Sequence, residues 1–269
     1  MAAVAKMSAK TLESGAEAII GVSPVDGIRG TCAIRPREFG KESGLEAPRA
    51  ILWDWDNTLV DGWRAITAAS NVAFAAFGLP TWTETETRAR AVGSIRDTFP
   101  KLFGPDWERA RALFFEAFDS LHLDWLRSMP GAEAALVVAA AWPQGIVSNK
   151  TGHYLRREVA HLRWESRFGA LVGAGDASAD KPHPAPIWHA LTMIGMRPDP
   201  TIWYVGDTGS DIRAARAAGC TAVLLGDASH EGGIEGLRTR GSEPDLHYAD
   251  ASALAARLRA LRGDAASLD

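Results

Sequence analysis

From residue 50 onward, short apolar runs alternate with longer segments in which apolar residues recur at helical spacing. The short runs predict buried strands. They are Ala50–Trp53, Gly145–Val147, Ala170–Val172, Ile202–Val205 and Ala222–Leu225. The longer segments predict helices at Ala132–Ala141, Gly152–His161, Ala185–Ile194 and Ser210–Ala218. Alternation of this kind predicts an α/β fold, in which helices cover both faces of a parallel sheet and the active site lies at the carboxyl ends of the strands.

The connection between the first two strands is far longer than the others. It contains predicted helices at Trp63–Phe77, Glu84–Ala91 and Asp106–Leu126. A segment of this length indicates a small α-helical cap domain at residues 63–129, inserted into a core made of residues 49–62 and 130–269. The predicted hinges lie near Gly62 and at Met129-Pro130.

Residues 1–48 lack sustained periodicity and mix small residues, glycine, proline and both charges. This composition predicts a flexible N-terminal extension, in which Ala16–Val22 is the best candidate for a short regular element.

Composition excludes several function classes. Hydrophobic residues make up 46% and charged residues 23% of the chain, and the formal net charge is −4, so neither a general nucleic-acid binder nor a membrane-surface protein is expected. The longest apolar run, near Ala134–Trp142, is far shorter than the roughly 18 residues of a membrane span. The two cysteines, Cys32 and Cys220, are not expected to pair, and this usage together with the N-terminal composition predicts a cytoplasmic protein.

The first predicted strand ends in two aspartates one residue apart, Asp54 and Asp56. In an extended chain, side chains at i and i+2 share a side, so both carboxylates can face one pocket. One could attack phosphorus while the other transfers protons, and a divalent cation would offset their repulsion and desolvation. An Asp-x-Asp sequence by itself is weak, but its position directly after an apolar strand makes it specific.

Three more polar groups follow later strands. Ser148 and Asn149 follow the second strand, where they could bind phosphate or simply cap a helix. Lys181 precedes Pro182 and could neutralise phosphate, although a loop lysine is usually only solvated. Asp207 and Asp211 follow the fourth strand, where paired carboxylates can bind a hard cation such as Mg²⁺.

The motifs DWDNT, VSNK, DKPHP and GDTGSD, in this order at strand ends, resemble the haloacid dehalogenase superfamily over roughly residues 50–230. Their spacing fits the variant with a helical cap after the first motif, on a Rossmann-like core. The resemblance implies Mg²⁺ as cofactor and a small phosphorylated metabolite as substrate. A monomer or homodimer is expected, and the sequence does not choose between them.

The resemblance also implies a role for each motif residue. Asp54 would be the nucleophile that forms an aspartyl-phosphate, and Asp56 the general acid and then base. Ser148 and Lys181 would hold the transferring phosphoryl group, and Asn149 would position the substrate or the loop. The metal would be held by Asp54, the backbone carbonyl of Asp56 and Asp207, with Asp211 supporting the site directly, through water or through Lys181. Backbone N–H groups near Trp55–Asn57 would complete the phosphate cradle.

Two positions depart from the family pattern. Asn57 stands where the family most often has glycine, and because asparagine tolerates unusual backbone angles the turn is expected to survive. Trp55 replaces a more usual phenylalanine or leucine. The acid at position 56 argues against the dehalogenase and phosphonate hydrolase branches, which lack it.

The triplet Ser148–Lys150 and the run Lys181–Pro184 most resemble the phosphoglycolate phosphatase-like group. The leading hypothesis is therefore a Mg²⁺-dependent phosphatase of small phosphate monoesters, with phosphoglycolate as one candidate substrate. A phosphomutase similar to β-phosphoglucomutase and a non-catalytic phosphate-binding module are the alternatives. Arg96, in the predicted substrate loop 90–96 of the cap, could pair with a substrate carboxylate or be a surface residue, and His183 is expected to be structural rather than catalytic.

Overall fold

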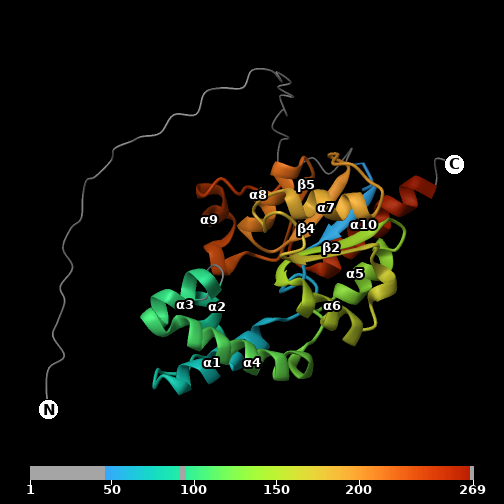
Figure 1. Ribbon diagram of the computed structural model, residues 1–269. Helices are drawn as coiled ribbons and strands as arrows, with labels where there is room; N and C mark the ends of the chain where they lie inside the picture. Colours follow the sequence, from blue (N-terminus) through green and yellow to red (C-terminus); the bar gives the residue numbers. More distant parts are fainter. Residues whose placement is uncertain (1–45, 91–94, 267–269) are drawn as a thin grey trace, which may run out of the picture. The chain divides into compact units, whose positions relative to one another are not determined.

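A parallel sheet forms the centre of the computed structural model, which describes residues 46–90 and 95–266, apart from the side chains of 96–97 and 264–266. Within these residues the sheet has six strands in the order β3-β2-β1-β4-β5-β6. Figure 1 shows the sheet with β2, β4 and β5 labelled. They are β1 (Ala50–Trp53), β2 (Gln144–Thr151), β3 (Ala170–Ala174), β4 (Ile202–Gly206), β5 (Thr221–Leu225) and β6 (Leu246–Tyr248). The predicted α/β class and parallel sheet are confirmed.

The strand order places a natural binding site beside β1. The chain builds outward from β1 through β2 to β3, then returns to the other side of β1 and builds β4, β5 and β6. In open sheets of this kind, the crevice beyond the carboxyl ends of the strands where the order reverses receives the ligand. Here that point lies between β1 and β4.

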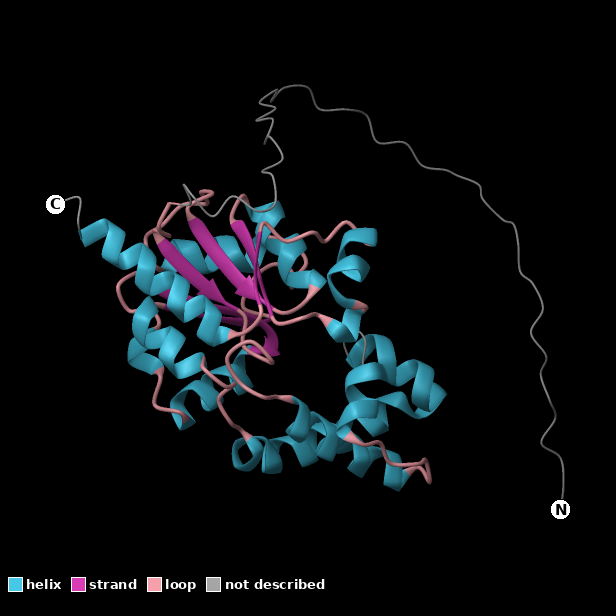
Figure 2. Ribbon diagram, turned by 180° about the vertical axis from the view of Figure 1, so that it is seen from behind, coloured by secondary structure: helices cyan, strands magenta, loops and turns pink. Residues whose placement is uncertain are grey.

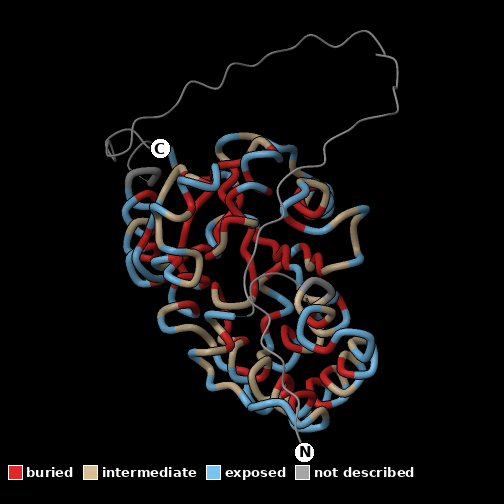
Figure 3. Tube along the Cα trace, turned by 90° about the vertical axis from the view of Figure 1, so that its left-hand side faces the viewer, coloured by how far each residue is buried: buried red, intermediate tan, exposed pale blue. Residues whose placement is uncertain are grey.

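Helices cover both faces of the sheet, as Figure 2 shows. In β1, Ile51 and Trp53 pack into one apolar cluster while Ala50 and Leu52 pack into another, because successive side chains of a strand point to opposite faces. The first face is covered by α5 (Ala132–Ala139), α6 (Gly152–His161) and α10 (Ala251–Ala266). The second is covered by α7 (Ala185–Met193), α8 (Gly209–Ala218) and α9 (Gly233–Thr239). In Figure 3 the buried positions, in red, accordingly gather in the interior, and the exposed positions, in pale blue, lie toward the outside.

Four helices lie between β1 and α5, and we call them the helical insertion. They are α1 (Trp63–Ala76), α2 (Glu84–Arg90), α3 (Ile95–Phe103) and α4 (Trp107–Trp125). They share an apolar cluster of their own, in which Phe74, Phe99 and Phe114 are nearly inaccessible to solvent. The predicted helices near α1, α2 and α4 are present. Whether the insertion behaves as a separate cap domain stays a prediction.

The helical insertion contacts the core through α4 and α6. Asp119 of α4 forms an ion pair with Arg157 of α6. Phe118 and Tyr154 meet edge to face with ring centroids 5.1 Å apart. These contacts fix one side of α4 against the helix that follows β2.

Some predicted features fall outside the part of the chain that the structure describes. The short element at Ala16–Val22, the side chain of Arg96 and nearly all of the predicted extension are among them. Within the described ranges, no helix combines the length and the apolar character needed to cross a membrane.

Candidate active site

The loop after β1 carries both predicted catalytic aspartates. Asp54 directly follows the strand, where its backbone N–H donates to the carbonyl of Val205 in β4 at 2.8 Å, and its side chain is buried. Asn57 adopts a left-handed backbone with a φ of 63°, so the turn expected to tolerate asparagine is formed. The N–H of Asn57 donates to the carbonyl of Val60 at 2.6 Å and is engaged within the loop. This N–H is therefore not available to a phosphate, and the expectation that N–H groups near Trp55–Asn57 form a phosphate cradle stays a prediction for the others.

Lys181 joins the carboxyl ends of β1, β2 and β4. Its Nζ donates to Asp54 Oδ1 at 2.6 Å, to Asp211 Oδ1 at 2.6 Å and to the hydroxyl of Tyr204 at 2.8 Å. A fourth contact, 3.1 Å long, reaches the carbonyl of Val147. Burial lowers the pKa of Lys181, but its attraction to Asp211 and Asp54 outweighs this and holds the pKa well above its usual value. The lysine is therefore a fixed cation beside Asp54.

Asp207 and Asp211 lie where β4 turns into α8. Asp211 forms a capping box with Thr208: Asp211 Oδ2 accepts from the N–H of Thr208 at 3.0 Å, while the backbone N–H of Asp211 donates to the Thr208 hydroxyl. Gly206 allows this close approach, because a Cβ there would lie 2.4 Å from the Asp211 carboxyl carbon. With its other oxygen on Lys181, Asp211 is placed to hold the lysine as well as the helix.

Three buried carboxylates converge at this edge of the sheet. Oxygen atoms of Asp54, Asp207 and Asp211 lie within 4.8 Å of one another. Burial raises the pKa of Asp54 to about 7, against the opposing effect of Lys181. Burial, followed by repulsion from Asp54 and Asp211, raises the pKa of Asp207 well above its usual range. Such a set carries more negative charge than Lys181 balances, so its oxygen donors fit a hard divalent cation.

The predicted substrate residues of β2 divide into two kinds. Ser148 is buried in β2, and its hydroxyl accepts from the N–H of Lys150 at 3.1 Å, which leaves the hydroxyl hydrogen able to donate to a phosphate oxygen. Asn149 forms two hydrogen bonds of 2.9 Å with the main chain of Lys181, one in each direction. Asn149 therefore holds the Lys181 loop in place, and whether it also positions the substrate stays a prediction.

Asp56 lies outside the group of three carboxylates. Its Oδ1 accepts from Lys150 Nζ at 2.7 Å, and Lys150 in turn donates to Glu158 Oε2 at 2.6 Å. Burial raises the pKa of Asp56, while Lys150 opposes that shift. A Cβ at Gly62 would lie 2.4 Å from Asp56 Oδ1, so only glycine leaves room for this carboxylate.

Several of these partners were not predicted. Lys150 stood in a motif without a role, and Glu158 and Tyr204 were not singled out. A signal for Glu158 exists, because a charged residue beside Val159 and three positions after Leu155 falls on the apolar side of a predicted helix. A charge in that place needs a buried partner.

His183 and Arg96 are the two residues whose roles the sequence left open. His183 Nδ1 accepts from the N–H of Ala185 at 3.1 Å, which is a structural contact at the start of α7 and agrees with the expectation. α3 begins at Ile95, inside the predicted substrate loop, and the side chain of Arg96 lies outside the described residues.

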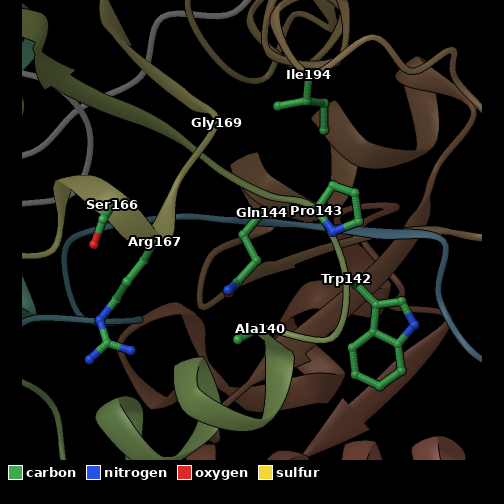
Figure 4. Close-up of a pocket in the computed structure, with 8 residues that line it drawn as sticks. All are labelled: Ala140, Trp142, Pro143, Gln144, Ser166, Arg167, Gly169 and Ile194. Atoms are coloured by element: carbon green, nitrogen blue, oxygen red, sulfur yellow. The ribbon is translucent and has the colours of Figure 1, made fainter.

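A cavity of about 450 Å³ opens at the other edge of the sheet (Figure 4). It is lined by Ala140, Trp142, Pro143, Gln144, Ser166, Arg167, Gly169 and Ile194. Gln144 begins β2 and Gly169 precedes β3, so this cavity lies at the amino ends of the strands. The carboxylates and Lys181 are at the carboxyl ends.

Comparisons with known proteins identify the family of this chain. Residues 51–225 match the family model described as haloacid dehalogenase-like hydrolase. A phosphoglycolate phosphatase from Xylella fastidiosa (strain 9a5c) is 34% identical over 192 residues, which cover 68% of this chain and 83% of the relative. Another, from Photorhabdus laumondii, is 32% identical over 67% of this chain and 81% of its own length.

Solved structures show the same fold. A haloacid dehalogenase-like family hydrolase from Streptococcus pneumoniae superposes with a TM-score of 0.66 at 20% identity, covering 81% of this chain and 98% of that one. A haloacid dehalogenase-superfamily hydrolase from Geobacter sulfurreducens gives a TM-score of 0.62 at 20% identity, covering 80% and 99%. The chain belongs to the haloacid dehalogenase-like hydrolase family, and within it the protein is a phosphoglycolate phosphatase-like enzyme.

Proposed function

We propose that this enzyme hydrolyses small phosphate monoesters through a covalent intermediate on Asp54, with Asp56 as the group that moves protons. One observation carries the proposal: a buried aspartate at the end of β1 lies 2.6 Å from a fixed lysine and beside two further carboxylates. A nucleophilic carboxylate, a fixed cation and a cluster of oxygen donors are the parts that phosphoryl transfer requires.

In the first step, an Asp54 oxygen forms a bond to phosphorus while the bond from phosphorus to the ester oxygen breaks. The leaving oxygen takes a proton from Asp56 and departs as an alcohol. Lys181 and the Ser148 hydroxyl stabilise the negative charge on the phosphoryl oxygens while the phosphoryl group is transferred to Asp54.

In the second step, water attacks the phosphorus of the aspartyl-phosphate and gives its proton to Asp56. The bond from phosphorus to Asp54 breaks, so inorganic phosphate leaves and both aspartates return to their starting states. The same residue therefore acts first as acid and then as base.

The cluster of Asp54, Asp207 and Asp211 suits Mg²⁺, with Asp54 and Asp207 as the side-chain ligands and the backbone carbonyl of Asp56 as a third ligand. When bound, the cation would neutralise negative charge on the phosphoryl group and on the carboxylates. Asp211 has both oxygens engaged, with Lys181 and with Thr208, so we assign it to holding these groups.

The relatives and the helical insertion support this choice of substrate class. Phosphoglycolate phosphatases are about one-third identical to this chain, which makes phosphoglycolate the first ester to test. The helical insertion next to the site would exclude water and select the alcohol part of the ester. A phosphomutase would use the same acid pair but transfer the phosphoryl group to a second sugar phosphate.

The central experiment compares Asp54→Asn with wild type in the presence of Mg²⁺. Asparagine keeps the shape of the side chain but cannot form the intermediate, so kcat should fall by on the order of 10³ or more. Release of inorganic phosphate from p-nitrophenyl phosphate, phosphoglycolate, sugar phosphates and nucleotides provides the measurement. Asp106→Asn, at the N-cap of α4 where the side chain makes no capping hydrogen bond, is a matched control that should keep full activity.

Removal of the metal provides a second arm of this experiment. Chelation should abolish turnover of every ester that wild type hydrolyses, and added Mg²⁺ should restore it, because the carboxylate cluster is electrostatically unbalanced without a cation. Retained turnover by Asp54→Asn would refute the covalent mechanism. Accumulation of a bisphosphorylated sugar, without net phosphate release, would favour the phosphomutase.

A further inference from the structure

A buried chain of side chains leads from Asp56 to the helical insertion. Lys150 Nζ lies 2.7 Å from Asp56 Oδ1 and 2.6 Å from Glu158 Oε2, and its side chain is only 7% exposed. Glu158 Oε1 lies 2.9 Å from Nδ1 of His122 in α4. The chain thus joins the loop after β1, the end of β2, α6 and α4.

Glu158 is the centre of this chain. It is 1% exposed, and besides Lys150 and His122 it accepts a hydrogen bond of 2.6 Å from the indole N–H of Trp55. Burial alone would raise the pKa of Glu158, but Lys150, His122 and Trp55 together lower it, so the group is a carboxylate. A buried carboxylate is stable only when its oxygens are paired, and here both oxygens are engaged.

His122 shows how specific the contact with the insertion is. Since an ionised carboxylate only accepts, the Nδ1 of His122 donates to Glu158. The Nε2 atom of the same ring is buried, with no hydrogen-bond partner in the described part of the chain. The ring also stacks on Phe118, with centroids 5.1 Å apart. In the described part of the chain, the ring of His122 therefore makes its hydrogen bond to Glu158 through Nδ1, while leaving the buried Nε2 unpaired is energetically unfavourable.

Among the described residues, Asp56 and Glu158 are the two anions that contact Lys150, whose Nζ also lies 5.6 Å from the centroid of the Phe118 ring. A lysine ammonium is a point charge on a flexible stem, so it needs opposite charge on more than one side to stay in one place. Without the charge of Glu158, Lys150 keeps the ion pair with Asp56 and the weaker contact with the Phe118 ring, and the Lys150–Asp56 pair can shift together. Gly62 limits such a shift on only one side of Asp56.

We propose that Glu158 is a positioning residue for Asp56: it fixes the ammonium of Lys150 against the Asp56 carboxylate, and through His122 it makes that arrangement depend on the contact between α4 and α6. This inference rests on the proposed function of Asp56 as general acid. It assigns a role to a residue that does not touch the substrate, and it connects the insertion to proton transfer as well as to substrate selection.

The test uses the dependence of the reaction on its leaving group. An alkyl phosphate such as phosphoglycolate releases a poor leaving group that needs a proton, whereas p-nitrophenyl phosphate releases a phenolate that does not. The ratio kcat/KM reports the reaction up to transfer of the phosphoryl group to Asp54, so it isolates the acid step. Glu158→Gln should lower kcat/KM for the alkyl ester about tenfold more than for the aryl ester, a part of the 10²–10⁴ that general acid catalysis contributes.

Two further variants separate positioning from packing. His122→Phe keeps an aromatic ring but removes the donor to Glu158, and it should shift the same ratio in the same direction by a smaller factor. Asp119→Asn breaks the other ionic contact between α4 and α6, its pair with Arg157, and should leave the ratio unchanged. Equal losses on both esters in Glu158→Gln, or an equal shift in Asp119→Asn, would overturn the proposal.

A second measurement observes Lys150 directly by NMR, and it requires neither enzymatic activity nor wild-type stability. In metal-free protein labelled with ¹⁵N-lysine, the buried Lys150 ammonium should give a slowly exchanging signal that is lost in Lys150→Met and weakened in Glu158→Gln. An unchanged signal in Glu158→Gln would refute the fixing of Lys150 by Glu158. Suppose that wild type is active and Asp54→Asn is not. An unchanged ratio of kcat/KM between the alkyl and aryl esters in Glu158→Gln then refutes the positioning role alone. If wild type is inactive on every ester, the proposed function is refuted as well.

Discussion

At the scale of single residues, Asn57 sets the direction in which the loop after β1 leaves the sheet. Its φ of 63° is a conformation that costs most L-residues about 1–2 kcal/mol, whereas glycine adopts it freely. Replacing Asn57 by alanine or by glycine removes the same side-chain amide, so the two variants differ chiefly in the backbone. Asn57→Gly should therefore be more stable than Asn57→Ala by about 1 kcal/mol in urea unfolding of metal-free protein.

Equal unfolding free energies for the two variants would contradict the left-handed turn. Asn71→Ala and Asn71→Gly form a reference pair in α1, where glycine should be the less stable residue by about 1 kcal/mol. The difference in unfolding free energy between the alanine and glycine variants should therefore have opposite signs at positions 57 and 71.

The sequence predicted that Asp54, Lys181 and Asp207 lie near one another, because each comes after the end of a predicted strand of one parallel sheet. The carboxyl ends of parallel strands meet at one edge, so that inference needs only local patterns. The partners of Asp56 could not be found in this way. Glu158 lies on a helix, and its contact with Trp55 spans 103 positions, so only the packing of α6 on the sheet brings the two together.

At the scale of elements, the strands and helices that were predicted have strong periodicity and clear boundaries. β6 has only three residues, with His247 exposed between Leu246 and Tyr248, so it offers no apolar run. α3 contains Pro100, which usually marks the end of a helix. These elements exist because neighbours complete them: β6 pairs with β5, and the Phe99 ring of α3 packs on Phe114 of α4.

The apolar cluster of the helical insertion provides a test of whether the insertion is a separate unit. Phe114 is 3% exposed within that cluster, and its replacement by alanine should cost about 3–5 kcal/mol. If the insertion unfolds by itself, hydrogen exchange in Phe114→Ala should rise across α1 and α4 and remain slow in β1, β4 and β5. Leu136→Ala, in the cluster between α5 and the sheet, is the matched control and should raise exchange in the strands instead. A rise in both regions in Phe114→Ala would show that the two unfold as one.

At the scale of the whole molecule, all the groups assigned to chemistry lie between Asp54 and Asp211. The family model begins at residue 51, and the Streptococcus pneumoniae hydrolase aligns along 98% of its own length while covering 81% of this chain. The strands and helices of the family fold are therefore supplied by the residues that follow the predicted extension. The predicted extension, residues 1–48, contributes none of the motif residues.

A chain that begins at residue 46 should accordingly keep the turnover of the full-length enzyme. We expect kcat and KM for the best ester of the panel to change by less than about twofold. The reason is that Ala47, which packs against the apolar cluster of Ile51 and Trp53, would be retained. Thermal unfolding of the two chains should have the same midpoint for the same reason. A shorter chain that begins at residue 53 would lose most of β1 and is expected not to fold, because Ala50, Ile51 and Leu52 are fully buried between β2 and β4. If the chain from residue 46 instead loses activity while it keeps its melting point, residues 1–45 act in substrate binding or in closure of the site, and the assignment of all chemistry to positions 54–211 is wrong.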